Sequence, residues 1–206
     1  MRQLSIPALA ATATLLLALS ACGPLVQIGG NDKAPAALMT LRATAAPVAN
    51  TTAYDRSRAV LVQIPAASGA LQTLRVPVIT SDTQLAYLTG ATWAEQPNRQ
   101  LQRVLADTLE ANGVATLDPR AAPLTPGRSL DGTLIECSLD VRDVAHVMAR
   151  VRYDAALATN SKGPVALRRF DASEPVVSQS PADVAVALNT AANRLAGDVA
   201  NWVKAN

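Results

Sequence analysis

Few residues in this chain are suited to covalent or metal chemistry. It has two cysteines, Cys22 and Cys137, and a single histidine, His146. A thiol beside an imidazole can act as a nucleophile, but Cys137 falls on the apolar face of a predicted strand, where thiols are usually inert, and His146 falls in a predicted turn. The sequence also lacks a Gly-x-Ser-x-Gly elbow, a Walker A loop and enough ligands for zinc. We therefore predict no enzymatic activity, no cofactor and no metal site.

Cys22 stands at the end of an apolar N-terminal stretch. Arg2 supplies a positive start, and residues 4–19 are mainly apolar or small, which is the layout of a secretory signal. This stretch is shorter than the roughly 20 apolar residues that span a bilayer. The run Leu19-Ser20-Ala21-Cys22 resembles the lipobox of bacterial lipoproteins, in which the cysteine sulfur receives a diacylglyceryl group. We predict a signal peptide over residues 1–21 and Cys22 as the lipid anchor; the alternative is an ordinary secretory signal with a chance cysteine.

The residues after Cys22 separate an anchor from a domain. Residues 22–36 include Gly29, Gly30 and Pro35, which is typical of a flexible tether with a root-mean-square reach of about 20 Å. We expect a single domain over residues 37–206, and no later stretch approaches 18 consecutive apolar residues. In known lipoproteins an Asp after the cysteine retains the protein at the inner membrane. Gly23 therefore predicts the outer membrane, facing the periplasm, with inner-membrane retention as the alternative.

The composition excludes several classes of protein. The chain has 206 residues, a formal net charge of +2, 50% hydrophobic residues and only 3% aromatic residues. This charge is too small to indicate a nucleic-acid binder, two cysteines exclude a disulfide-dense scaffold, and the apolar content argues against wholesale disorder. The mean hydropathy is positive, at +0.17. The signal peptide accounts for part of that excess, and small apolar residues in a sheet core account for the rest.

Several extended runs predict a sheet. Residues 38–43, 58–64, 74–80, 85–88 and 114–117 are short strand candidates, and Pro77 indicates an edge position or a bulge because proline cannot donate to a ladder. Residues 135–142 and 147–155 alternate strictly and predict an antiparallel hairpin, followed by a third strand over residues 165–173. In the first arm of the hairpin, the apolar face is predicted to hold Ile135, Cys137, Leu139 and Val141.

Two amphipathic helices complete the predicted fold. The first runs over residues 97–112 and ends at Gly113. The second follows the cap Ser180-Pro181 and continues to the C-terminus. Its apolar stripe comprises Val184, Leu188, Ala191, Leu195, Val199 and Trp202. We predict an α+β fold in which a curved, mostly antiparallel sheet carries both helices on one face.

Three side chains are candidates for a partner interface: Trp93, Arg150 and Arg152. Trp93 directly precedes the first predicted helix, and the alternative for this residue is a core packing role. The two arginines lie on the predicted wet face of the sheet, near Arg142, Arg168 and Arg169. They could dock an acidic partner or lipid headgroups; the alternative is a solvated face that also carries Asp140 and Asp154.

Several segments together resemble the ABC-type transport auxiliary lipoprotein family, in its PqiC-like group. They are the lipobox, the run Ala-Val-Leu-Val-Gln-Ile-Pro at residues 59–65, residues 85–95 with Trp93-Ala94, and Leu109-Glu110-Ala111-Asn112-Gly113. Arg168-Arg169-Phe170 and Glu174-Pro175-Val176, before an Ala/Leu-rich terminal helix, fit as well. The resemblance covers roughly residues 37–204, and residues 87–112 are its most specific part.

This resemblance implies a role in transport rather than a reaction. Members accompany transporters that move lipids between the inner and outer membranes, with a periplasmic MCE-domain protein as partner and, through it, a permease and an ATPase. The resemblance therefore implies a docking or accessory subunit that faces the periplasm. The alternative is a structural lipoprotein of envelope assembly that takes no part in lipid flux. The sequence leaves open whether several copies form a homo-oligomer.

Overall fold

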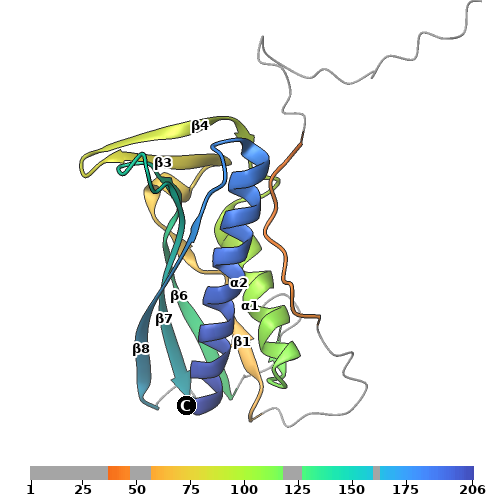
Figure 1. The fold of residues 1–206 in the computed structure, drawn as a ribbon. Coiled ribbons are helices and arrows are strands. Elements are labelled where there is room, and N and C mark those ends of the chain that lie inside the picture. The colour runs from red at the N-terminus through yellow and green to blue at the C-terminus, as the bar shows by residue number, and fades with distance from the viewer. Residues whose placement is uncertain (1–36, 47–56, 118–126, 160–162) are drawn as a thin grey trace, which may run out of the picture. The chain divides into compact units, whose positions relative to one another are not determined.

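The computed structural model describes residues 37–46, 57–117, 127–159 and 163–206. The predicted signal peptide, the tether and Cys22 lie outside these residues. The described part contains one sheet and two α-helices, which lie on the same face of the sheet (Figure 1). The predicted α+β class and the placement of both helices are therefore confirmed, and the sheet is mixed, since parallel pairs accompany the antiparallel ones.

The strand β6 (Arg128–Asp140) organises the sheet. Along one edge it pairs antiparallel with β7 (Met148–Thr159), which pairs in turn with β8 (Val165–Pro175). Along its other edge it pairs in parallel, one after another, with β1 (Val60–Val62), β2 (Ala66–Ala67) and β3 (Arg75–Ser81). The long hairpin thus follows the alternation predicted from the sequence, whereas the parallel pairs join segments far apart in the chain.

Short elements extend the sheet at its margins. A 3-10 turn (Gly69–Leu71) precedes β3, β4 (Gln84–Thr92) pairs antiparallel with β3, and β5 (Thr116–Leu117) pairs in parallel with β1. Pro77 lies in β3 beside an irregularity of the β3–β4 register, as the bulge alternative predicted. The edge alternative is wrong, because β3 lies between β4 and β6.

The two helices bury the stripes that the sequence predicts. The helix α1 (Pro97–Ala111) ends before Gly113, which adopts a φ of 79° and donates its N–H to the Glu110 carbonyl. The helix α2 (Pro181–Ala205) is capped by the Ser180 hydroxyl, which accepts a hydrogen bond from the Asp183 N–H. All the stripe residues of α2 are buried in one core with the inward side chains of β6, β7 and β8.

A bulge in β6 corrects one detail of the predicted hairpin. The β6–β7 register shifts between Leu134 and Glu136, so Ile135 is an extra residue in its strand. Leu134 is fully buried and pairs with buried Tyr153, whereas Ile135 is only partly buried. The apolar face of β6 is therefore formed by Leu130, Leu134, Cys137 and Leu139, and Ile135 is not part of it.

Residues 38–43 do not form the predicted strand. Their only sheet pairing among the described residues is a single parallel bridge from Met39 to Trp93. The Met39 N–H donates to the Thr92 carbonyl at 2.8 Å, and the Ala94 N–H donates to the Met39 carbonyl at 2.9 Å. Beyond this bridge the chain leaves the sheet and runs along both helices (Figure 1).

Candidate functional site

The predicted interface arginines lie on the face of the sheet opposite the helices, where carboxylates neutralise them. Arg152 Nε lies 2.5 Å from Asp171 Oδ1, and Arg150 Nε lies 3.0 Å from Asp140 Oδ2. Register explains this pairing, because Arg152 stands opposite Asp171 on β8 and opposite Glu136 on β6. The structure thus brings Arg150 and Arg152 together, but inside a network of alternating charge.

Asp140 is the centre of that network. Its carboxylate is buried and accepts two hydrogen bonds from the Arg142 guanidinium, at 3.0 and 2.8 Å. These hydrogen bonds hold the pKa of Asp140 below its usual value. Arg142 also contacts Asp82 at 2.6 Å, so it joins the β6 end to the β3–β4 turn. The face therefore presents balanced charge, as the solvated-face alternative predicted, rather than an unpaired positive patch.

Trp93 does not lie at the surface, so the prediction of this residue as an interface candidate is wrong and its core alternative is correct. Its side chain is 1% exposed and belongs to the core cluster. The chain brings it inward because the Trp93 N–H donates to the Leu74 carbonyl at 2.8 Å and Met39 bridges it from the other side. Trp202 is also buried and packs edge-on against Phe170.

Cys137 and His146 occupy the places that the sequence predicts. Cys137 is fully buried, and this burial raises the pKa of its thiol to about 12, so the reactive thiolate is disfavoured. His146 lies in the exposed turn between β6 and β7, where Nδ1 is 2.8 Å from Asp143 Oδ2. Among the described residues, no group of His, Cys, Asp and Glu could hold a metal ion.

The segment of residues 38–44, which we call the N-terminal segment, is held by side-chain amides. The Leu41 N–H donates to Gln100 Oε1 on α1 at 2.7 Å. Farther along, the Arg42 and Thr44 N–H groups donate to the side-chain oxygens of Asn189 and Asn193 on α2, at 2.8 and 2.7 Å. These amides take the place of a neighbouring strand, because each offers the backbone a carbonyl-like acceptor.

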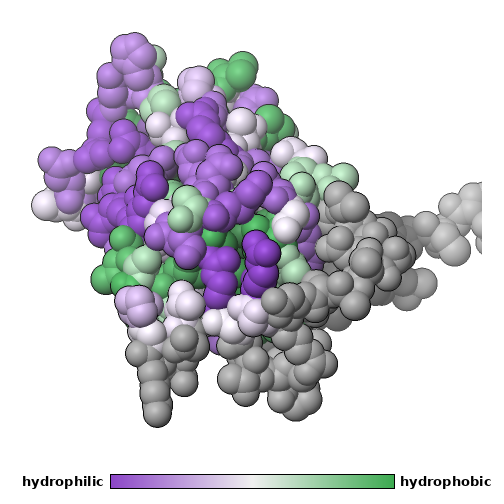
Figure 2. All heavy atoms as spheres, turned by 90° about the horizontal axis from the view of Figure 1, so that it is seen from below, coloured by the Kyte–Doolittle hydropathy of each residue, from purple (hydrophilic) through white to green (hydrophobic). Residues whose placement is uncertain are grey.

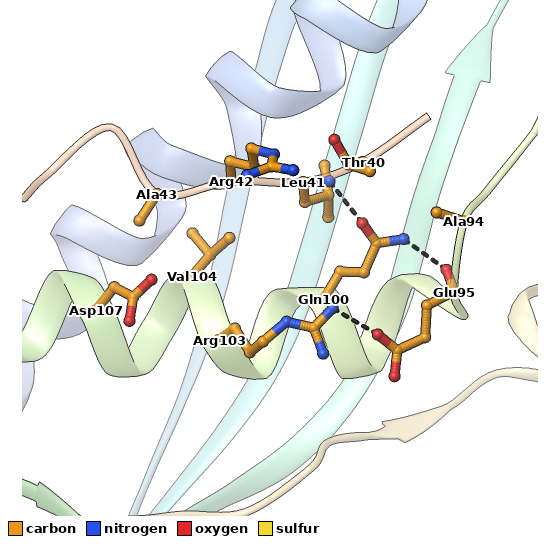
Figure 3. Close-up of a pocket in the computed structure, with 10 residues that line it drawn as sticks. All are labelled: Thr40, Leu41, Arg42, Ala43, Ala94, Glu95, Gln100, Arg103, Val104 and Asp107. Carbon is orange, nitrogen blue, oxygen red and sulfur yellow. Dashed lines mark hydrogen bonds and ion pairs between the residues drawn. The ribbon is translucent and has the colours of Figure 1, made fainter. Parts of the chain in front are cut away.

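A hollow of about 480 Å³ opens between the N-terminal segment and α1 (Figure 3). The Gln100 amide crosses it, since Oε1 accepts from Leu41 and Nε2 donates to the Glu95 carbonyl at 2.5 Å. Arg103 forms an ion pair with Glu95 at the rim. Partial burial raises the pKa of Asp107, which also lines the hollow. Of the polar groups in this hollow, the Gln100 amide holds the N-terminal segment, and Arg103 and Glu95 pair with each other.

A second, apolar groove lies on the other side of the N-terminal segment, against the start of α2. Its volume is about 600 Å³. Arg42 is the only ionisable side chain among the described residues that line it. Most of the lining is small or aliphatic, and it is supplied by Ala37, Leu38, Met39, Gly90, Pro181, Ala182, Ala185 and Val186. This groove and the N-terminal segment are our candidate functional site.

Sequence reasoning missed this site. Asn189 and Asn193 are four residues apart and therefore share one side of α2, away from its apolar stripe. That spacing was the available signal, but it did not identify their partner, which is more than 140 residues away in the chain. In the sequence, Leu38 and Val186 are isolated aliphatic residues, and only the fold places both of them in the lining of one groove.

The comparisons with known proteins agree with this fold. Residues 40–200 match the sequence model of a family described as "ABC-type transport auxiliary lipoprotein component". No curated protein matches the chain.

Neither helix of the described residues is both long enough and apolar enough to cross a bilayer.

Two solved structures resemble the chain. Protein XCC0632 from Xanthomonas campestris, of family DUF330, is 22% identical, with a TM-score of 0.69, and the match covers 81% of this chain and 94% of that one. A structure titled only as an uncharacterized protein is 15% identical, with a TM-score of 0.62, and covers 81% of this chain and 99% of that one. At these identities the likeness shows a shared fold.

Proposed function

Because the chain belongs to the ABC-type transport auxiliary lipoprotein family, we propose that it is a periplasm-facing accessory subunit of an MCE-associated transporter that moves lipids between the two membranes. The observation that carries this proposal is the family match over residues 40–200, which takes in every described strand and both helices up to residue 200. Its role is to dock the periplasmic MCE-domain protein and, through it, the permease and the ATPase. Docking needs no reaction at this chain.

The proposed anchor is Cys22, which carries the lipid after the signal peptide of residues 1–21 is removed. One acyl chain binds a membrane only marginally, so stable anchoring needs the two or more chains of a mature lipoprotein cysteine. The tether of residues 22–36 then joins the anchor to the domain. Gly23 favours the outer membrane, and the domain faces the periplasm.

Two features of the described domain support an accessory role. Its buried thiol has a raised pKa, and its exposed histidine is hydrogen-bonded in a turn, so neither group supports covalent catalysis. Its sheet face carries paired charges rather than a binding site for a free anion. We propose that Arg150 and Arg152 contact the partner only with the parts of their side chains that remain exposed on this charge-balanced face of the sheet.

The anchor can be tested with the two cysteines of the chain. With residues 1–21 exchanged for a signal peptide whose removal does not depend on Cys22, we expect Cys22→Ala to release the mature domain into the soluble fraction. Cys137→Ala should leave it at the membrane, because Cys137 is a core residue. Membranes are washed with high salt before fractionation, so that electrostatic adhesion is removed. If the Cys22→Ala protein stayed bound after this wash, the anchor would be wrong.

The docking role is tested by affinity purification of the lipidated full-length chain from detergent-solubilised membranes. Recovery of the MCE-domain protein, together with its permease and ATPase, is the expected result. Reproducible failure to recover an MCE-domain protein, with unchanged lipid distribution when the gene is deleted, would refute the proposal. Altered envelope complexes in that deletion strain would instead support a structural lipoprotein of envelope assembly.

A further inference from the structure

The apolar groove beside the N-terminal segment exposes aliphatic side chains to water, which is unfavourable for apolar surface. Leu38 is 55% exposed on one wall, and Val186, in the second turn of α2, is 67% exposed on the other. Isolated exposed aliphatic residues are common on protein surfaces, but these two line the same hollow. By contrast, the surface seen from below, towards the C-terminal end of α2, is mostly hydrophilic with smaller hydrophobic areas (Figure 2).

The charge at the groove has one sign. Arg42 is exposed and makes no ion pair with another described residue, and no carboxylate of the described residues lines the groove. Glu95 and Asp107 lie in the neighbouring hollow, which Arg42 also borders. The nearest acid along α2, Asp183, is hydrogen-bonded to the hydroxyls of Ser178 and Ser180. An occupant that satisfies this site therefore has an apolar part for the groove and an anionic group for the rim.

The polar atoms of the groove are largely committed to the protein itself. Asn189 Oδ1 accepts from the Arg42 N–H, and the Thr190 hydroxyl donates to the Val186 carbonyl at 2.9 Å. Ser180 caps α2. Few donors remain to recognise a polar peptide, which favours an aliphatic chain as the occupant.

The covalent path of the chain limits the distance between this groove and the proposed anchor. Ala37, the first described residue, lines the groove, so the tether from the proposed anchor enters the domain here. About 15 residues span at most about 50 Å when fully extended. The groove therefore remains within that distance of the membrane that holds Cys22, a step that rests on the proposed anchor.

We propose that this groove binds an acyl chain of a membrane phospholipid, while Arg42 contacts the headgroup phosphate. The small side chains of Ala37, Ala182 and Ala185 leave room for the chain, and Leu38 and Val186 cover it from either side. The proposal deepens the accessory role, because it gives the domain a direct contact with the lipid that its transporter carries.

The test uses the mature chain, residues 22–206, with Cys22→Ala, so that neither a covalent lipid nor the apolar signal segment contributes, and vesicles of phosphatidylethanolamine and phosphatidylglycerol. We expect Val186→Asp to weaken vesicle binding at least about tenfold, because a charge replaces a contact in the groove. Val165→Asp is the matched control, since Val165 is 54% exposed at the start of β8. Arg42→Gln should weaken binding about fivefold and Arg42→Lys should restore it.

Both aspartate variants change exposed residues, and thermal unfolding verifies that each one folds. Equal losses for Val186→Asp and Val165→Asp would overturn the proposal, and so would absence of vesicle binding by the parent protein. A photoreactive residue at position 186 identifies the occupant in cells: a lipid adduct supports the proposal, and crosslinking to a polypeptide overturns it. Recovery of the MCE-domain protein by the lipidated Val186→Asp chain separates the two questions, because docking can persist when lipid binding is lost.

Discussion

Replacement of Asn193 by alanine tests how the N-terminal segment is attached to the domain. The Asn193 side chain accepts hydrogen bonds from the Thr44 N–H at 2.7 Å and the Thr44 hydroxyl at 3.1 Å, and it donates to the Arg42 carbonyl at 2.8 Å. Asn193 on α2 therefore both accepts hydrogen bonds from this segment and donates one to it. The alanine variant removes all three contacts and leaves the helix backbone intact.

The magnitude follows from these contacts. Each hydrogen bond contributes about 1 kcal/mol net, and alanine returns roughly 0.6 kcal/mol through its higher helix propensity. The expected loss in the free energy of unfolding is therefore about 2 kcal/mol. For a domain of this size, that loss lowers the midpoint of thermal unfolding by about 4–8 °C.

The assay compares Asn193→Ala with Asn201→Ala in the unlipidated Cys22→Ala background. Asn201 is exposed on the same helix and has no hydrogen bond from its side chain to a described residue, so its replacement should leave stability unchanged or raise it by about 0.5 kcal/mol. Hydrogen exchange adds a local measurement, because only Asn193→Ala should accelerate exchange of the Thr44 amide. If the two variants had equal stability and equal Thr44 exchange, the attachment would not depend on Asn193.

Three further predictions concern the sheet and the helices. Asp140→Asn should lower the free energy of unfolding by about 1–3 kcal/mol at neutral pH, as measured by urea unfolding. Because Arg142 lowers the folded-state pKa of Asp140, this difference from the parent should shrink as the pH falls below about 4. A difference that persisted in acid would contradict this origin. Cys137 should react with a thiol reagent only after denaturation, since it is buried and its pKa is about 12; labelling of the folded protein at neutral pH would show that this core opens. Gly197→Ala should stabilise α2 by about 1 kcal/mol, because a methyl group there meets no neighbour. Gly132→Ala should instead destabilise the domain, since its methyl group would lie 2.1 Å from the Asp154 carbonyl oxygen. Thermal unfolding of both variants checks this contrast, and similar shifts in the unfolding midpoint would contradict it.

Local patterns predicted the long elements well, because their causes are local. The stripe and the Ser180 cap located α2, and Gly113 located the end of α1. Strict alternation predicted the β6–β7 hairpin, since side chains of a strand alternate between its two faces. The pairing of Arg150 with a carboxylate also follows from this alternation, because acids and arginines share the outer face of neighbouring strands.

The failures involve pairing and packing that the pattern of a single segment does not contain. The bulge at Ile135 depends on how β6 pairs with β7, and the period of a single strand does not reveal it. Trp93 is drawn into the core by Leu74 and by Met39, which lies more than 50 residues earlier in the chain. Residues 38–43 have the pattern of a strand, yet side-chain amides of the helices bind their backbone, so only one bridge to the sheet forms.

The sequence by itself determined the α+β class and the main helices and strands, because each depends on residues close together in the chain, and it predicts a lipid anchor at Cys22. Only the tertiary structure decided that Leu38 and Val186 line one groove with Arg42 at its rim. These residues come from the two ends of the domain, and the sequence around each of them does not indicate how far apart they lie in the fold. Packing of the N-terminal segment against α2 supplies that distance, and with it the surface that we propose contacts lipid.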